Sequence, residues 1–267
     1  MSKEKIERII NDGTEKLLCV FDFDKTLCYP FWKGEKDSTT FSVFRDLDLI
    51  SPEYVKESND LFDHYYPKEM STDLSYKERL KYMEEWWSKH LELFIKYKIN
   101  KQMIVEAVAS GKIHLREGVK ISFDLANEKN IPILILSAGL GDVIQEVLKH
   151  VGINHPNIHI ISNFYKFDEI GDVVGYEPHI IHSMNKNEKD LPDEMLRTFG
   201  DRSNVILAGD SLSDLHMTQG LVTNEVLSFG FLNGNLTLEQ SFKDKFDIVL
   251  LDAEESFKTL NDILNKI

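Results

Sequence analysis

The sequence contains few cysteines and no long hydrophobic segment. At 267 residues the chain is too long for a small disulfide-stapled module, and its two cysteines, Cys19 and Cys28, leave no second pair for a zinc site. Apolar runs such as residues 131–136 are far shorter than the roughly 20 residues that cross a bilayer. Residues 1–14 carry charges and lack the apolar segment of a signal peptide. We therefore expect a cytoplasmic protein with reduced cysteines and no membrane partner.

Basic residues are also scarce. Lys and Arg total 31 against 45 Asp and Glu, so the net charge is -14 and the summed field repels nucleic-acid backbones and anionic lipids. This field predicts that no nucleic-acid polymer is a partner. It also repels small phosphate esters, so a substrate of that kind would need a local metal ion or lysine. Hydrophobic residues at 42% and charged residues at 28% are ordinary for a folded globular chain.

The chain does contain a series of short apolar runs that end in polar or small residues. Residues 17–21 form the first predicted strand, and residues 131–136 form another that ends in a turn beginning at Ser137. Helical patterns alternate with such strands, which indicates an α/β fold around a mostly parallel sheet, where ligands bind at the carboxyl ends of strands. Further strands are predicted at residues 204–207, 226–229 and 248–251, helices at 119–129, 142–150 and 215–219, and a hairpin at 157–178.

A segment of different composition interrupts this alternation of strands and helices. Residues 31–104 hold many aromatic and charged residues, with helical spacing in their second half. Ser137 comes more than 100 residues after Asp24, whereas a single helical crossover needs about 30. We therefore predict an inserted helical domain at residues 31–104 and a core formed by residues 1–30 plus 105–267.

Two carboxylates follow the first predicted strand. The side chains of Asp22 and Asp24 can point into one crevice at the strand end. Burying both requires a cation, or one of the acids held neutral. A nucleophile beside a general acid would use such a pair, but an Asp-x-Asp is also typical of a helix cap or a solvated turn.

Three later segments carry polar residues near predicted strand ends. Ser137 and the N–H groups after it could hold an anion, although a serine there is also typical of a plain capped turn. Lys186 by itself is typical of a solvated surface lysine. Asp210 and Asp214 follow a strand, either as metal ligands or as helix caps. Together with the first pair, these segments supply a nucleophile, an acid, phosphate ligands and metal ligands in one order along the chain.

In this order the segments resemble the four motifs of the haloacid dehalogenase-like phosphohydrolases. The resemblance spans nearly the whole chain and implies a Rossmann-like parallel-sheet core with an inserted helical cap. The residues that carry it, in motif order, are Asp22-x-Asp24-x-Thr26, Ser137, Lys186 and Asp210-x-x-x-Asp214.

This resemblance also implies a mechanism. Asp22 is expected to attack phosphorus and form an aspartyl-phosphate, while Asp24 protonates the leaving oxygen and then activates water. Mg²⁺ is expected to be held by the Asp22 carboxylate, the Asp24 backbone carbonyl and Asp210. The implied phosphate-binding and supporting residues are Ser137, Ala138, Lys186, Thr26 and Asp214.

Further segments narrow the resemblance to cytosolic 5'-nucleotidase III, the pyrimidine 5'-nucleotidase family. That family hydrolyses nucleoside 5'-monophosphates, chiefly CMP and UMP, while some members prefer 7-methylguanosine monophosphate. By this resemblance Glu69 hydrogen-bonds the base, and His90 occupies the position of a substrate-contacting serine. The segments are Tyr65-Tyr66-Pro67-Lys68-Glu69, Tyr82-Met83-Glu84-Glu85-Trp86, Ser137 to Val143, His155-Pro156-Asn157, Ser162-Asn163-Phe164 and Asn185-Lys186.

Two questions stay open at this stage. The substrate is either a nucleotide or another small phosphate ester, such as phosphoserine or a sugar phosphate, and a catalytically silent nucleotide-binding regulator is the alternative of a different class. A regulator has no need for a nucleophile, which favours an enzyme. The aromatic residues of the insertion either stack on a base or form its core, and they are Trp32, Phe41, Trp86 and Trp87.

Overall fold

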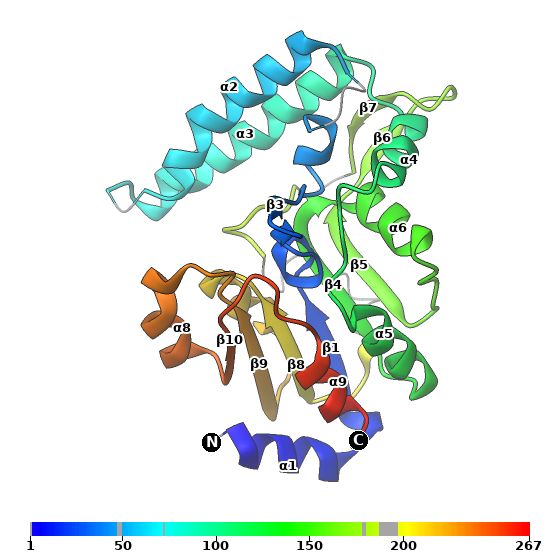
Figure 1. The fold of residues 1–267 in the computed structure, drawn as a ribbon, viewed down its shortest axis with the longest axis vertical. Helices are drawn as coiled ribbons and strands as arrows, with labels where there is room; N and C mark the ends of the chain where they lie inside the picture. Colours follow the sequence, from blue (N-terminus) through cyan, green and yellow to red (C-terminus); the bar gives the residue numbers. More distant parts are fainter. Residues whose placement is uncertain (1, 47–49, 72, 178–179, 187–196) are drawn as a thin grey trace.

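The computed structural model describes residues 2–46, 50–71, 73–177, 180–186 and 197–267, and a six-stranded sheet lies at its centre (Figure 1). Every pairing in this sheet is parallel, in the order β10-β9-β8-β1-β4-β5. The predicted α/β fold with a parallel sheet is confirmed. Its strands are β1 (Leu17–Phe21), β4 (Ile133–Leu140), β5 (Ile158–Asn163), β8 (Asn204–Gly209), β9 (Glu225–Phe231) and β10 (Ile248–Leu250).

Helices and two short ribbons surround the sheet. No helix within the described ranges is both long and apolar enough to cross a membrane. The ribbons are antiparallel pairs of β2 (Phe31–Trp32) with β3 (Glu35–Lys36) and β6 (Tyr165–Phe167) with β7 (Val173–Tyr176). The described α-helices are α1 (Ser2–Asp12), α2 (Pro52–Glu69), α3 (Tyr76–Lys96), α4 (Lys101–Ala109), α5 (Val119–Glu128), α6 (Gly141–His150), α8 (Glu239–Lys245) and α9 (Lys258–Leu264).

The strand β1 is central because it is apolar throughout. All five of its residues are buried, and alternate side chains enter two different hydrophobic clusters. Leu17, Cys19 and Phe21 pack in one cluster, while Leu18 and Val20 pack in the other. Both faces of the sheet are therefore covered, as a parallel sheet requires.

The sheet extends in opposite directions from β1, so the order in which successive strands are added reverses there. Strands β4 and β5 extend the sheet on one side of it, and β8, β9 and β10 extend it on the other. A crevice at the carboxyl ends of the strands forms where the strand order reverses, and this is where α/β proteins bind ligands.

Helices α2 and α3 form a long hairpin that projects away from the sheet, at the end opposite α1 (Figure 1). Ser51 caps α2 by accepting a hydrogen bond from the Tyr54 N–H, and Pro52 occupies the first turn. Ser75 and Glu78 form a capping box at the start of α3. The predicted boundary between residues 104 and 105 falls inside α4, which packs against α6 of the sheet layer.

Two local predictions were wrong. The turn predicted from Ser137 is extended backbone, because β4 continues through a register shift to Leu140, where it pairs with Asn163. The hairpin predicted over residues 157–178 divides instead: β5 joins the main sheet and only β6 and β7 form a hairpin, while residue 178 lies outside the described residues. Loose alternation does not distinguish an edge strand of the sheet from a hairpin strand.

Candidate active site

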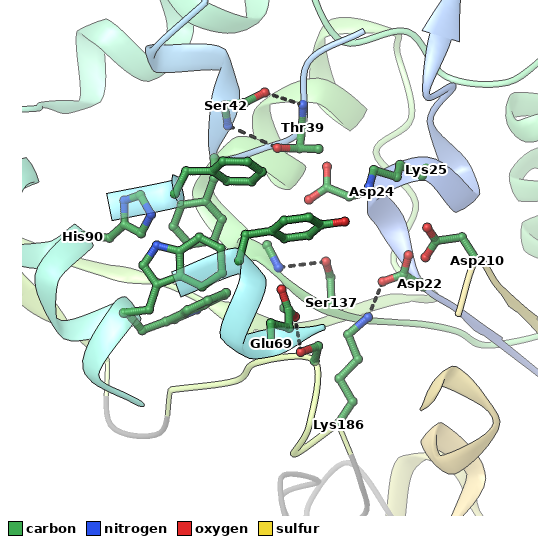
Figure 2. A pocket seen from close by; sticks show the side chains of 18 of the residues that line it. Asp22, Asp24, Lys25, Thr39, Ser42, Glu69, His90, Ser137, Lys186 and Asp210 are labelled. Carbon is green, nitrogen blue, oxygen red and sulfur yellow. Dashed lines mark hydrogen bonds and ion pairs between the residues drawn. The ribbon is translucent and has the colours of Figure 1, made fainter. Parts of the chain in front are cut away.

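A cavity of about 270 Å³ lies between the carboxyl ends of the central strands and the α2–α3 hairpin (Figure 2). Carboxylates and two lysines, Lys25 and Lys186, gather at one end of it, and aromatic side chains gather at the other. The structure brings most of the predicted site residues to this cavity, namely Asp22, Asp24, Glu69, His90, Ser137, Ala138, Lys186 and Asp210.

Lys186 joins two buried carboxylates at the floor of the cavity. Its ammonium donates to Asp22 Oδ1 and to Asp214 Oδ1, the latter at 3.2 Å. The other Asp214 oxygen accepts from the N–H groups of Asp210 at 3.1 Å and Ser211 at 2.9 Å. Asp214 therefore fixes both the lysine and the turn after β8. No hydrogen bond from the described residues reaches the second Asp22 oxygen, which stays available to a substrate.

Asp24 is held by a residue that sequence reasoning missed. Thr40 donates to the two Asp24 oxygens, from its N–H at 2.8 Å and from its hydroxyl at 2.7 Å. The same hydroxyl accepts from the Leu140 N–H at 3.1 Å, so it links Asp24 to the end of β4. A Cβ on Gly139 would lie 2.3 Å from the Thr40 hydroxyl and 2.8 Å from Asp24 Oδ2, so only glycine permits this approach.

Burial and mutual repulsion shift the acids of this site. Desolvation raises the pKa of Asp24 to about 6, although the hydrogen bonds from Thr40 oppose the shift. Desolvation, with the charges of Asp22 and Asp214, raises the pKa of Asp210 to about 8. Desolvation also raises the pKa of Asp214 to about 6 against the opposing charge of Lys186. Burial disfavours the charged form of Lys186, but Asp214 and Asp22 outweigh it and raise its pKa.

The carboxylates fit a divalent cation. One oxygen from each of Asp22, Asp210 and Asp214 lies within 4.8 Å of the others. Oxygen ligands of this kind suit a hard cation, whose charge would offset both the burial and the repulsion by Asp22 and Asp214 that raise the pKa of Asp210. Thr40 donates to both oxygens of the Asp24 carboxylate, and the backbone carbonyl of Asp24 stays a predicted ligand.

Ser137, its neighbour Ala138 and Thr26 are the predicted site residues that remain, and each makes a hydrogen bond that involves the backbone. Ser137 Oγ accepts from the Gly139 N–H at 3.0 Å, and the Ala138 carbonyl accepts from Asn163 Nδ2 at 2.8 Å. Both residues line the cavity. The Thr26 hydroxyl is buried and has no hydrogen-bond partner among the described residues, whereas its carbonyl accepts from Arg116. This arrangement favours a loop-fixing role for Thr26.

His90 and Glu69 lie on the aromatic side. His90 is buried, with ring centroids 5.2 Å from Phe41 and 5.9 Å from Trp86. Desolvation lowers the pKa of His90 to about 4, so the ring is neutral near pH 7. The Glu69 carboxylate accepts from the Ser183 hydroxyl.

Three of the four aromatic residues named from the sequence lie at the cavity and also form a core, and their stacking on a base stays a prediction. Phe41, Trp86 and Trp87 line the cavity and also pack with Tyr65 and Met83 in a cluster of their own. Trp32 instead stacks on His114 at a centroid distance of 4.6 Å.

Sequence and structure comparisons agree with this geometry. The pyrimidine 5'-nucleotidase (UMPH-1) family matches residues 25–267. The chain belongs to this family. A relative from Xenopus laevis, 7-methylguanosine phosphate-specific 5'-nucleotidase A, is 37% identical over 265 residues, covering 98% of this chain and 91% of the relative. The chain is therefore a 5'-nucleotidase, a phosphoric monoester hydrolase.

Solved structures place this 5'-nucleotidase in the haloacid dehalogenase-like fold, as the sequence analysis expects. A crystal structure of cytosolic 5'-nucleotidase IIIB bound to cytidine matches with a TM-score of 0.89 and 27% identity, covering 98% of this chain and 89% of that one. An apo phosphoserine phosphatase matches with a TM-score of 0.51 and 15% identity, over 92% of this chain and 98% of that one, which shows the fold alone.

Proposed function

We propose that this 5'-nucleotidase hydrolyses its substrate by Mg²⁺-dependent chemistry through an aspartyl-phosphate on Asp22. One observation carries the proposal: a single cavity joins the Asp22–Lys186 pair to an aromatic wall on which a base can stack. The phosphate would lie at the carboxylate end, beside Ser137 and Lys186, where the lysine supplies the local positive charge that the acidic chain otherwise lacks.

The proposed reaction has two displacements. The Asp22 oxygen that is not paired to Lys186 attacks phosphorus, the P–O5' bond breaks, and Asp24 donates a proton to the leaving oxygen. Water then attacks phosphorus, Asp24 takes its proton, the bond from phosphorus to Asp22 breaks and phosphate leaves. An Asp24 pKa of about 6 suits a group that gives a proton in one step and takes one in the next.

Mg²⁺ would be held by the carboxylates of Asp22 and Asp210 and by the Asp24 carbonyl. When bound, it supplies positive charge to a transferring phosphoryl group. We assign Asp214 the role of orienting Lys186, because its two oxygens are engaged by the ammonium and by two backbone N–H groups.

We propose 7-methylguanosine monophosphate as the preferred nucleotide. Methylation at N7 gives the guanine ring a positive charge, and aromatic faces and a carboxylate both attract a cation. The aromatic wall, the Glu69 carboxylate and the neutral ring of His90 suit such a base. Arg45 also lines the wall, but it lies 3.9 Å from the Asp46 carboxylate and over the Phe62 ring. The name of the Xenopus laevis relative supports this choice.

CMP and UMP are the second candidates. The family name and the cytidine in the neighbouring crystal structure both support them. A pyrimidine is neutral, so its binding would rest on stacking and on a hydrogen bond to Glu69.

The division of labour in the cavity supports a core and a cap. Asp22, Ser137 and Lys186 come from the proposed core of residues 1–30 plus 105–267, and the aromatic wall comes largely from the proposed cap of residues 31–104. The core would then bind phosphate and the cap would select the base. We also propose that the enzyme acts in the cytosol, on the strength of the name of its structural neighbour.

Phosphate release by the purified protein tests these proposals. The substrates are 7-methylguanosine monophosphate, CMP, UMP, AMP and phosphoserine, each with Mg²⁺ and with EDTA. We expect release that EDTA abolishes, highest from 7-methylguanosine monophosphate and lowest from phosphoserine. Highest release from CMP or UMP would instead establish the second candidate, and no Mg²⁺-dependent release from any nucleotide would contradict the proposed chemistry.

A further inference from the structure

Arg116 is a buried arginine that no motif includes. Its side chain is 2% exposed, and all five of its N–H groups have acceptors. Nη1 donates to the carbonyls of Ala253 at 2.9 Å and Glu255 at 2.8 Å, on the segment between β10 and α9. Nη2 donates to Asn233 Oδ1 at 2.5 Å and to the Lys25 carbonyl at 2.9 Å, while Nε donates to the Thr26 carbonyl at 2.9 Å.

Arg116 thereby holds three successive carbonyls of the loop that follows Asp24. Its own backbone N–H donates to the Leu27 carbonyl at 2.8 Å, next to the bonds to Lys25 and Thr26. Asn233 Nδ2 adds a second bond to the Lys25 carbonyl at 3.1 Å. The loop is joined in this way to parts of the chain that lie about 90 to 230 residues away in sequence.

The loop needs external support because its backbone is unusual. Lys25 has φ 63° and ψ 0°, the left-handed conformation that residues with a Cβ seldom adopt. Asp24, just before it, has extended backbone at φ −66° and ψ 124°. Asp22 and Asp24 both line the cavity, so the carbonyls of Lys25 and Thr26 that Arg116 holds come directly after these two acids.

The acceptors of Arg116 show that it is not an ion-pair partner. Among the described residues, no carboxylate lies within salt-bridge distance of its guanidinium, which contacts carbonyl dipoles and the rings of Phe231 and Tyr29. Burial lowers the pKa of Arg116 to about 10. A buried guanidinium is costly, and its planar fork of five donors can hold five acceptors at once, whereas a lysine has three donors and an apolar residue has none.

We infer that Arg116 is a positioning residue for hydrolysis: it acts through the Lys25–Leu27 carbonyls to hold Asp22 and Asp24 in their reactive geometry. The inference rests on the proposed roles of those two acids. It predicts that loss of the guanidinium lowers kcat far more than it changes KM, because Phe41, Trp86 and Trp87 at the aromatic end of the cavity lie outside this loop.

Arg202 provides a matched control at the other end of β1. It donates to the carbonyls of Thr14 at 2.6 Å, Leu17 at 2.9 Å and Asn130 at 3.0 Å. The chemistry is the same, but the carbonyls lie at the amino end of the strand, away from the cavity.

The test compares Arg116→Met and Arg116→Lys with Arg202→Met. Steady-state kinetics with the preferred nucleotide are measured below the melting temperature of each variant, which is determined first. We expect Arg116→Met to lower kcat by about 100-fold, since displacement of reacting groups by about 1 Å costs that much. We expect about a tenfold loss for Arg116→Lys, KM within threefold of wild type for both, and kcat within twofold for Arg202→Met.

Two further readouts separate positioning from a general loss of stability. Millimolar guanidinium ion should restore kcat at least fivefold in Arg116→Ala and should not change Arg202→Ala. Amide hydrogen exchange of residues 22–29 should be faster in Arg116→Met than in wild type or Arg202→Met. If Arg116→Met does not fold, Arg116→Lys and Asn233→Ala take its place, the latter with an expected fivefold loss of kcat.

The inference is overturned if folded Arg116→Met retains kcat within threefold of wild type, or if Arg202→Met loses as much. Absence of guanidinium rescue together with unchanged hydrogen exchange would overturn it as well. Asp22→Asn distinguishes this failure from failure of the proposed function. If wild type releases phosphate and Asp22→Asn does not, the proposed chemistry stands whatever the Arg116 variants do, and hydrogen exchange tests the loop contact independently of activity.

Discussion

The two ends of β1 are built from similar parts and differ in what those parts hold. At the amino end Arg202 donates to backbone carbonyls, and Asn204 donates to the Asp12 carboxylate at 2.9 Å. At the carboxyl end Arg116 also donates to carbonyls, but it supports a left-handed residue beside repelling carboxylates. Strain and like charge therefore collect at one end of a strand whose middle is entirely apolar. The contacts at the amino end therefore hold backbone segments together, whereas the carboxyl end sacrifices stability to hold reactive groups.

The largest expected effect is on the rate of phosphate release, and it distinguishes Asp22 at the carboxyl end of β1 from Asp12 near its amino end. Asp22→Asn removes the proposed nucleophile and should lower the rate of phosphate release by about a thousandfold or more, with folding intact. The matched variant Asp12→Asn alters an acid at the amino end and should keep the rate within twofold. Steady-state phosphate release and circular dichroism measure both; a tenth of the normal rate in Asp22→Asn would remove Asp22 as nucleophile.

The second prediction concerns pH. Desolvation lowers the pKa of His90 from the ordinary value of 6.5 to about 4 in the folded state. Above pH 6.5 the ring is neutral in both states; as the pH falls towards 4 the unfolded chain binds a proton that the folded chain does not. The free energy of unfolding should therefore fall by about 3 kcal/mol between pH 6.5 and pH 4 because of His90. This corresponds to more than a hundredfold in the folding equilibrium.

Urea unfolding of wild type and His90→Phe at pH 7 and pH 4.5 measures this decline. The raised pKa values of Asp24 and Asp210 act in the opposite direction and are present in both proteins, so the difference between them isolates His90. We expect His90→Phe to lose less stability on acidification than wild type. Equal losses would show that the ring is not held neutral.

A third, smaller effect is expected at Thr40. Thr40→Val removes the hydroxyl that donates to Asp24 and accepts from Leu140, so kcat should fall by roughly tenfold to thirtyfold through misplacement of the acid. Ser122→Ala is the control, because it removes a buried hydroxyl that donates to Asn261 between α5 and α9. Both should lose about 1–2 kcal/mol of unfolding free energy. An equal loss of activity in Ser122→Ala and Thr40→Val would contradict a specific role for Thr40 in placing Asp24.

The smallest effect is expected at Glu69. Glu69→Gln keeps the shape of the side chain but removes the charge, so kcat/KM for 7-methylguanosine monophosphate should fall about tenfold, and that for CMP should fall less. Glu57→Gln is the control on the same helix, since Glu57 pairs with Lys96 and Tyr97 outside the cavity. Equal losses for the two nucleotides would argue against recognition of a charged base.

The strand β1 and the acids after it were predictable from the sequence, because adjacent residues specify both of them. Five apolar residues followed by two aspartates specify a buried strand and a polar strand end without reference to the rest of the chain. The alternation of strands and helices likewise predicted the parallel sheet. The course of β4 beyond Leu136 was not predictable in this way, because it depends on a shifted register with β5.

The supporting contacts of the site were beyond sequence reasoning. Thr40 reaches Asp24 across 16 positions and Arg116 reaches Lys25 across 91, and neither lies in a periodic pattern or a motif. Lys186 is indistinguishable in sequence from a surface lysine, but it is buried between the carboxylates of Asp22 and Asp214, which lie 164 and 28 positions away in the sequence. Such contacts follow from which loops the fold brings to one edge of the sheet.

The sequence by itself therefore determined the kind of fold, the carboxyl-end location of the chemistry and the order of the reactive residues, because each is specified by neighbours along the chain. The tertiary structure alone decided which acid is held by Thr40, which carboxylates share Lys186, and which arginine supports the left-handed turn at Lys25. These depend on distances between remote segments, and only the packed sheet and its loops fix those distances.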